Sequence, residues 1–255
     1  MSSRSLLEER IQDDPVINLL DYQARWIADK ARFKIGLWSR QTGKSFSVAS
    51  EAVIDCEENP RTNWVFLSSG ERQSKELIRK AKDLAAIVKM AFEETSSGLA
   101  VPGEKSIYKQ LEIEFGNGSR ILALPANPDT ARGHSANVVL DEFAFHQDSK
   151  AIWKSLFPTV TRGYKLRIIS TPQGRKNKFY ELWTGNPRYS KHLVTIWDAF
   201  KAGLPIFGED GELTTPDFLR EALDDEEAWQ QEYECQFLDE ATAWITYDLI
   251  TAAEH

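Results

Sequence analysis

Two groups of residues in this sequence have types and a spacing that suit chemistry. The first is Gly43-Lys44-Ser45, which follows an apolar run over residues 33–38 and a polar turn over residues 39–43. It opens a segment whose apolar residues recur at helical spacing. A strand, a turn and a helix in this order form a phosphate cradle, because backbone N–H groups and the helix N-terminus attract anions. The Lys supplies a point charge, and the Ser hydroxyl can ligate Mg²⁺.

The match to the general pattern G-x-x-x-x-G-K-[ST] is incomplete, because Trp38 stands where the pattern has its first glycine. A short Gly-Lys-Ser match also arises by chance. In that case Gly43 would only cap a tight turn and Lys44 would be a solvated surface residue. Whether this segment is a phosphate-binding loop or a simple capped turn depends on motifs elsewhere in the chain.

The second group is Asp141-Glu142, which ends the apolar run Asn137-Val138-Val139-Leu140. An apolar strand that ends in paired acids is the Walker B arrangement. Asp141 would hold Mg²⁺, usually through water, and Glu142 would orient and deprotonate an attacking water. Successive strand residues point to opposite sides, so adjacent carboxylates can serve different tasks. Asp-Glu after a strand is often a simple cap, but downstream of Gly-Lys-Ser it indicates a nucleotide hydrolase.

Further residues are candidates for contacts around such a site. Gln23 lies just before the first strand, where its amide could pair with both edges of adenine, although a lone Gln on a helix is usually solvated. Arg132 precedes the Walker B strand and suits either an arginine finger from a neighbouring subunit or a structural salt bridge. Ser170 or Thr171, with Asn177 shortly after, could sense the γ-phosphate, or could form a Pro-Gly turn capped by hydroxyls.

The elements that must position these residues alternate between strands and helices, as in an α/β domain. The apolar runs predict strands over residues 33–38, 64–68, 137–140, 165–169 and 192–197. Helical spacing predicts helices over residues 21–31, 44–57 and 71–90. Asn117-Gly118 between two alternating runs predicts an antiparallel hairpin over residues 106–124, added to an otherwise parallel sheet.

The last part of the chain predicts a small helical subdomain over residues 200–255, which would cover the nucleotide as a lid. Thr215-Pro216-Asp217 is a strong helix start, with a hydroxyl N-cap, Pro at the first helical position and an acid in the first turn. A second helical segment carries Trp229, Tyr233 and Phe237. Residues 1–199 would form the main subdomain, with a polar helix or loose arm over residues 1–14.

Composition sets limits on the class of protein. The chain has 255 residues and 42% apolar residues, which suits one large α/β domain with a small appended part. The sequence has no run long and apolar enough to span a bilayer and no apolar signal-peptide core near its start. Cys56 and Cys235 match no metal or redox pattern. The net charge of −8 argues against binding nucleic acid over the whole surface, but not against a local basic face.

The sequence resembles the N-terminal ATPase domain of tailed-phage terminase large subunits, over roughly residues 15–245. Four motifs carry the resemblance, and they lie at residues 39–45, 138–144, 170–183 and 229–237. In this family the phosphate loop lacks the first glycine and carries an arginine before the Gly-Lys pair. Trp38 and Arg40 therefore fit the family, although Trp38 departs from the general pattern.

The resemblance implies a P-loop NTPase fold of the RecA/ASCE-like class, with a mainly parallel sheet and helices on both faces. It implies that Glu142 is the catalytic carboxylate, that Arg132 is a trans-acting finger, and that Arg40 and Lys44 act on the phosphates. Gln23 would contact adenine, and Ser45 and Asp141 would hold the metal. Coupling of hydrolysis to movement would involve Ser170, Thr171 and Asn177. Nucleotide would be bound by Arg40, Gln41, Thr42, Gly43, Lys44, Ser45 and Phe46.

The implied reaction is hydrolysis of ATP with Mg²⁺, to power translocation of double-stranded DNA into a procapsid. The implied partners are DNA held without sequence preference, a portal protein, the terminase small subunit and further copies of this chain in a pentameric ring. No membrane is expected. An acidic isolated domain allows a monomer in solution, and the implied location is the host cytoplasm and, transiently, the portal vertex. Large subunits continue into a nuclease domain, for which this chain leaves no room, so we expect no nuclease activity from it.

Two alternatives stay open from the sequence. The domain could be a nucleotide-binding assembly module that hydrolyses little without ring partners, because a finger supplied in trans needs a neighbour. It could also be a helicase-like, DNA-stimulated ATPase, although such an enzyme normally needs a second motor domain.

Overall fold

The computed structural model describes residues 18–87, 92–100, 107–130 and 134–238, and an eight-stranded sheet lies at their centre. The strand order is β3-β4-β5-β2-β6-β7-β1-β8. All pairings from β5 to β8 are parallel, whereas β3-β4 and β4-β5 are antiparallel. The strands are β1 (Phe33–Trp38), β2 (Asn63–Ser68), β3 (Phe92–Ala100), β4 (Ile107–Phe115), β5 (Arg120–Pro125), β6 (Asn137–Asp141), β7 (Leu166–Ser170) and β8 (Ser190–Val194). The predicted parallel sheet with an added hairpin is confirmed, and β3 extends the hairpin by a strand that was not predicted.

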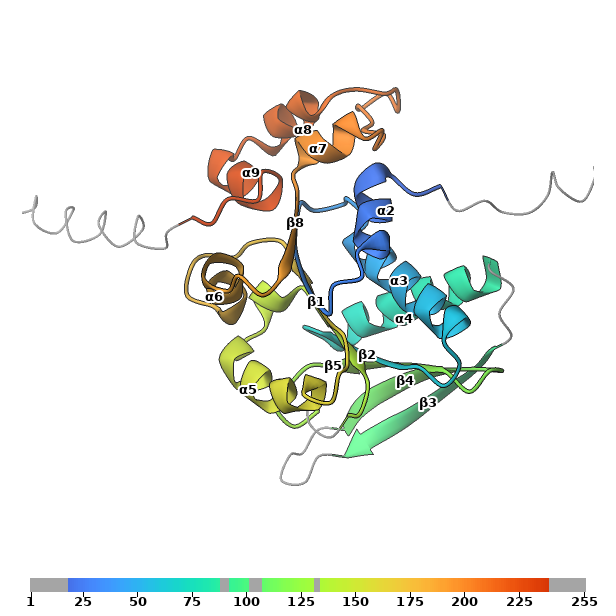
Figure 1. The fold of residues 1–255 in the computed structure, drawn as a ribbon. Helices are drawn as coiled ribbons and strands as arrows, with labels where there is room; N and C mark the ends of the chain where they lie inside the picture. Colours follow the sequence, from blue (N-terminus) through green and yellow to red (C-terminus); the bar gives the residue numbers. More distant parts are fainter. Residues whose placement is uncertain (1–17, 88–91, 101–106, 131–133, 239–255) are drawn as a thin grey trace, which may run out of the picture.

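Helices cover both faces of the sheet (Figure 1). On one face α2 (Asp21–Ala28), α3 (Lys44–Glu58) and α4 (Glu71–Ile87) pack over the side chains of one apolar core. On the other face the short 3₁₀ helix η1 (Phe143–Phe145), α5 (Ser149–Val160) and α6 (Lys178–Gly185) pack over a second core. The described residues include no helix with the length and apolarity that a membrane crossing requires.

The remaining helices are α7 (Ile196–Lys201), α8 (Pro216–Leu223) and α9 (Glu226–Glu232). They gather next to β8, at the top of Figure 1. They enclose a small apolar cluster of their own, built on Ile196, Ile206 and Trp229. The helices that the sequence predicts in this part of the chain are therefore present, and the division of the chain into subdomains at residue 200 stays a prediction.

One predicted strand is partly wrong, because the run over residues 192–197 is divided between two elements. β8 ends at Val194, and α7 begins two residues later. Thr195 caps α7: its hydroxyl accepts from the Asp198 N–H at 3.2 Å, and the Asp198 carboxylate accepts from the Thr195 N–H at 3.0 Å. This reciprocal capping box satisfies two N–H groups at the start of the helix, so the apolar residues after Thr195 are helical.

Several predicted helices differ in extent from those in the structure. The helix predicted over residues 21–31 is α2, which ends at Ala28 because Asp29 is already extended. The second C-terminal helix, α9, ends at Glu232, so Tyr233 forms its cap and Phe237 lies beyond it. Phe237 packs instead against Phe179 and Tyr180 of α6, with ring centroids 6.2 and 4.9 Å apart. The long helix α4 ends at Ile87, and the predicted extension to residue 90 lies outside the described residues, as does the predicted arm over residues 1–14.

Buried ion pairs fasten α3 to the sheet. Glu51 of α3 accepts from Arg167 of β7 through one carboxylate oxygen, at 2.8 Å from Nε and 2.7 Å from Nη2. Its other oxygen lies 2.9 Å from Nζ of Lys34 on β1. All three side chains are buried, with exposed fractions of 9%, 1% and 0%. Charges buried this deeply persist only when they are paired, so this triad fixes α3 against β1 and β7.

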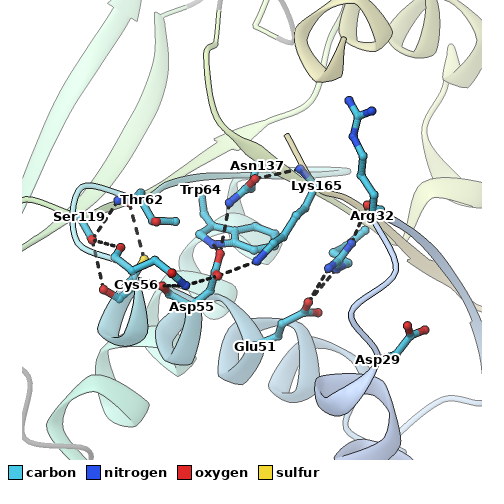
Figure 2. A network of polar contacts seen from close by, with 12 residues as sticks. Asp29, Arg32, Glu51, Asp55, Cys56, Thr62, Trp64, Ser119, Asn137 and Lys165 are labelled. Carbon is cyan, nitrogen blue, oxygen red and sulfur yellow. Dashed lines mark hydrogen bonds and ion pairs between the residues drawn. The ribbon is translucent and has the colours of Figure 1, made fainter. Parts of the chain in front are cut away.

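One helical turn further on, Asp55 makes a second set of contacts (Figure 2). Its carboxylate accepts from the Trp64 indole N–H at 3.0 Å and from the Asn137 amide at 3.3 Å. It also pairs with Nζ of Lys165 at 2.6 Å. These partners are the second residue of β2, the first residue of β6 and the residue before β7, so Asp55 ties α3 to the amino ends of three strands. The start of α3 lies at the opposite, carboxyl edge of the sheet.

Candidate nucleotide site

The turn between β1 and α3 has one position whose backbone favours glycine. Gly43 has φ 82° and ψ 25°, and a Cβ there would lie 2.5 Å from Nε2 of Gln23. The turn is braced from below: the Tyr22 hydroxyl donates to the Thr42 carbonyl at 2.9 Å, and the Thr42 hydroxyl donates to the Ser39 carbonyl at 2.7 Å. The result is a fixed loop at the carboxyl end of β1, where ligands bind in open parallel sheets.

Lys44 is the first residue of α3, and its side chain folds back over this loop. Only 6% of the residue is exposed. Nζ donates to the Ser39 carbonyl at 3.1 Å and to the Trp38 carbonyl at 3.4 Å, and it lies 3.3 Å from Oε1 of Glu142. The ammonium group therefore stands between the loop and the acid at the end of β6, which is the position that a phosphate-binding lysine requires.

Asp141 is buried at the carboxyl end of β6, with 3% of the residue exposed. Ser45 donates to its Oδ2 at 3.4 Å, whereas Oδ1 has no hydrogen-bond partner among the described residues. Burial, together with the neighbouring charge of Glu142, raises the pKa of Asp141, and Lys44 partly opposes this. A buried carboxylate oxygen without a donor, beside a serine hydroxyl, suits a hard divalent cation such as Mg²⁺, which prefers oxygen ligands.

Glu142 has a left-handed backbone, with φ 50° and ψ 46°, which is uncommon for a residue other than glycine. Such conformations cluster at functional sites, where the surrounding contacts hold them. Its Oε2 accepts from the Thr171 N–H at 3.2 Å and from the Ser170 hydroxyl at 3.4 Å. The Ser170 oxygen in turn accepts from the Ala144 N–H at 3.1 Å. The end of β7 therefore holds the acid at the end of β6.

These side chains surround one cavity of about 500 Å³. Its walls come from the loop after β1, the ends of β6 and β7, the exposed face of α4 and the last residue of α9. The predicted site residues that line it are Arg40, Gln41, Gly43, Lys44, Ser45, Phe46, Asp141, Glu142 and Thr171. The structure thus brings together predicted site residues that lie up to 131 positions apart in the sequence, from Arg40 to Thr171.

Two predicted nucleotide contacts lie beneath the loop and do not line the cavity. Gln23 is buried, its Oε1 accepts from the Leu20 N–H at 3.0 Å, and its Nε2 donates to the Thr42 carbonyl at 3.4 Å. Thr42 is fully buried and is part of the same bracing. In this structure both side chains support the loop, and contact of Gln23 with adenine stays a prediction.

Asn177 is the N-cap of α6 and does not line the cavity. Its Oδ1 accepts from the Tyr180 N–H at 2.9 Å, and its amide donates to the Gln173 carbonyl. Ser170 does not line the cavity either, but it contacts Glu142 as described above. A role of Asn177 in coupling therefore stays a prediction. Arg132 lies outside the described residues, so its predicted role in a neighbouring subunit stays a prediction too.

Arg40 contacts the C-terminal helices across the cavity. Its N–H donates to the Glu232 carbonyl at 3.0 Å, and its Nε lies 3.7 Å from Oε2 of Glu232. Burial raises the pKa of Glu232, and the charge of Arg40 opposes this. The Arg40 side chain is 59% exposed, so it is free to turn toward a ligand.

Sequence reasoning missed the walls that α4 and α9 contribute. Arg72, Gln73, Glu76 and Lys80 of α4 line the cavity, and so does Glu232 of α9. The basic side of α4 is visible in the sequence, but a charged run on a helix is more often a solvated face. The useful signal is topological: α4 follows β2, and β2 pairs with β6 in parallel, so α4 begins beside the two acids at the end of β6.

Comparisons with known proteins agree with this geometry. A family model described as "Terminase large subunit, T4likevirus-type, N-terminal" matches residues 35–252. The chain belongs to this terminase large-subunit family. The predicted resemblance to this family is therefore confirmed, and the roles of the phosphate-loop residues stay predictions.

Individual relatives support the same assignment. The chain is 30% identical to "Mu-like prophage FluMu protein gp28" of Haemophilus influenzae, over 97% of this chain and 52% of that protein. It is 28% identical to "Probable terminase, large subunit gp28" of Escherichia phage Mu, over 96% of this chain and 48% of that protein. It thus spans about half the length of these curated relatives. The large terminase ATPase domain of Thermus phage P74-26 shares the fold, with a TM-score of 0.63, 18% identity and coverage of 88% and 94%.

Proposed function

We propose that this chain is the ATP-hydrolysing motor domain of a terminase large subunit, which powers the movement of double-stranded DNA into a procapsid. The observation that carries the proposal is the convergence of Lys44, Ser45, Asp141 and Glu142 on one cavity. A cradle for phosphates, a site that fits Mg²⁺ and a carboxylate for water are the parts that phosphoryl transfer to water requires. Family membership and the relatives named as terminases and ATPase domains support the same function.

The reaction would be in-line attack of water on the γ-phosphorus, with ADP as the leaving group. The N–H groups of residues 40–45 and the Lys44 ammonium would bind the β- and γ-phosphates. Ser45 and Asp141 would hold Mg²⁺, which when bound neutralises charge on the phosphoryl oxygens. Arriving phosphate would draw Lys44 away from Oε1 of Glu142, which now lies 3.3 Å from it. That oxygen would then accept the proton of the attacking water, while the Thr171 N–H keeps the other oxygen in place.

The partners belong to the proposal as well. Binding to DNA would involve phosphates and no sequence preference, as expected for a motor that must translocate any sequence. A pentameric ring on a portal would place Arg132 of one subunit beside the nucleotide of the next. The C-terminal helices, from residue 200 onward, would act as a lid, because Glu232 already contacts the phosphate loop at Arg40. The small subunit would be a further partner, and the host cytoplasm the location.

An assembly module with little hydrolysis in isolation is the second candidate, and one observation favours it. Both oxygens of Glu142 are engaged, by Lys44 on one side and by Thr171 on the other, so no oxygen is held ready for water in the isolated chain. Neighbouring subunits would then be needed to complete the site.

The decisive experiment is the steady-state ATPase rate as a function of protein concentration for wild type, Glu142→Ala and Arg132→Ala. We expect the rate per chain to rise with concentration and both variants to lose it, because a finger in trans needs neighbours. A mixture of the two variants should recover part of the activity. Glu181→Ala removes an exposed carboxylate outside the cavity and is the matched control.

Full activity of Glu142→Ala would show that the assignment of the catalytic acid is wrong. A wild type that binds ATP but hydrolyses none at any concentration would favour the assembly module.

A further inference from the structure

One wall of the cavity is not used by the proposed reaction. Arg72, Glu76 and Lys80 of α4 line it at four-residue spacing, which places them on one face of the helix. This face looks toward the acids at the end of β6: Lys80 is among the charges that lower the pKa of Asp141, against the larger effect of burial. The α4 wall is thus close enough to the metal-binding and catalytic acids to act on the same ligand.

Four cations line the cavity, and they differ in how their charge is balanced. Three of them have a carboxylate partner: Arg40 with Glu232 at 3.7 Å, Lys44 with Glu142 at 3.3 Å and Lys80 with Glu76 at 2.7 Å. For Arg72 the structure shows no hydrogen bond or ion pair within the described part of the chain. The acid one turn along the same face, Glu76, is already hydrogen-bonded to Lys80, and this bond is the main cause of its lowered pKa.

The position of Arg72 within α4 is also unfavourable for the helix itself. α4 begins at Glu71, so Arg72 lies in the first turn, where the helix dipole favours negative charge. Glu76, one turn along the same face, feels the charge of Arg72 but is bonded to Lys80. A cation that faces a cavity, has no direct carboxylate partner among the described residues and stands at the positive end of a helix is suited to an anion that arrives from outside. A guanidinium group matches a phosphoryl group well, because its planar N–H donors bind two oxygens at once.

We propose that Arg72 binds the terminal phosphate of the nucleotide from the α4 side of the cavity, within the same subunit as the phosphate loop. The inference rests on the proposed function, since it needs a nucleoside triphosphate in this cavity. Lys44 and the loop then hold the β- and γ-phosphates from one side, and Arg72 holds the γ-phosphate from the other. ADP lacks the group that Arg72 contacts, so the residue makes the site discriminate between the triphosphate and the diphosphate.

The test is the affinity of the chain for ADP and for ATPγS, each with Mg²⁺, measured by calorimetry for wild type, Arg72→Ala and Arg72→Lys. Arg79→Ala is the matched control, because Arg79 is an exposed arginine of the same helix that does not line the cavity. We expect Arg72→Ala to weaken ATPγS binding about tenfold, which is about 1.4 kcal/mol, and to leave ADP binding within about twofold. Arg72→Lys should recover part of the loss, and Arg79→Ala should match wild type.

Two results would overturn the inference while the proposed function stands. One is unchanged binding of both nucleotides by Arg72→Ala. The other is an equal loss for ADP and ATPγS, which would mean a general electrostatic effect without contact to the γ-phosphate. Lys44→Ala tests the proposed function separately from the role of Arg72, because this variant should lose binding of both nucleotides if the cavity is the nucleotide site. If wild type binds neither nucleotide, the proposed function and this inference both fail.

Discussion

Replacing Glu51 with glutamine should destabilise the chain strongly, although Glu51 lies outside the nucleotide cavity. Its carboxylate is the counter-charge of two buried cations, Arg167 at 2.7 and 2.8 Å and Lys34 at 2.9 Å. The amide of glutamine keeps one acceptor oxygen, but its NH₂ group replaces the other oxygen and would face one of the two cations, which is itself a donor. Removing one partner of a buried ion pair costs about 3–5 kcal/mol, because it leaves charge buried without compensation. Since glutamine retains one hydrogen bond, we expect the lower end, about 3 kcal/mol.

The assay is urea unfolding followed by tryptophan fluorescence and by far-ultraviolet circular dichroism, together with thermal melting. For a chain of this size each kcal/mol shifts the midpoint by about 2–4 °C, so Glu51→Gln should melt roughly 6–12 °C below wild type. Glu181→Gln is the control: Glu181 also pairs with two lysines, Lys150 and Lys178, but it is exposed, and its loss should cost under about 1 kcal/mol. A Glu51→Gln variant within 1 kcal/mol of wild type, at about the level of the control, would refute this reasoning.

Further predictions concern single groups. Burial lowers the pKa of Lys34 to about 8 from 10.5, with Glu51 opposing the shift. Between these two pH values the unfolded chain binds more protons than the folded chain, so the free energy of unfolding rises with pH. Measured by urea unfolding, the stability of wild type relative to Lys34→Met should increase by roughly 3 kcal/mol across this range. A relative stability that falls over the same range would contradict the prediction. Asp141→Asn should stabilise the nucleotide-free chain by about 1 kcal/mol, because it removes a buried, partly unsatisfied carboxylate. In thermal melts it should also abolish the Mg²⁺-dependent stabilisation by ATPγS, and EDTA should have the same effect on wild type. Thr195→Ala should cost about 1 kcal/mol in the same unfolding assay through loss of the α7 cap, and Thr195→Ser should retain most of it.

The site could be predicted from sequence to the extent that its residues stand at the ends of apolar strands. Lys44 and Ser45 follow β1, Asp141 and Glu142 end β6, and Thr171 follows β7. Parallel strands place their carboxyl ends at one edge, so a prediction of parallel order is enough to bring such residues together. The same reasoning gives the two helical layers, since each strand needs a crossover to the next. Local pattern and strand order are therefore enough to predict the part of the site that lies at the carboxyl ends of β1, β6 and β7.

What the sequence could not supply depends on contacts between distant segments. The run over residues 192–197 has the apolar character of a strand, and only the exchange of hydrogen bonds between Thr195 and Asp198 turns its second half into a helix. Gln23 suits adenine by type, but its amide is committed to Leu20 and Thr42 in the folded chain. Glu232 and Arg72 enter the cavity from helices whose placement is set by packing, so no local signal marks them.

The two sides of the cavity are attached to the sheet by interactions of different strength. Below the phosphate loop, α3 is held by Glu51, which reaches β1 and β7, and by Asp55, which reaches the starts of β2 and β6 (Figure 2 shows the contacts of Asp55). The C-terminal helices meet the loop side through hydrogen bonds, from the Arg40 N–H to the Glu232 carbonyl at 3.0 Å and from the Gly174 N–H to the Gln231 amide oxygen at 3.3 Å. The ion pair of Arg40 with Glu232 is long, at 3.7 Å, and partly exposed, so it adds little. Breaking a buried ion pair costs several times as much as exchanging a hydrogen bond with water. A change at the nucleotide is therefore easier to accommodate by movement of the C-terminal helices than by movement of α3.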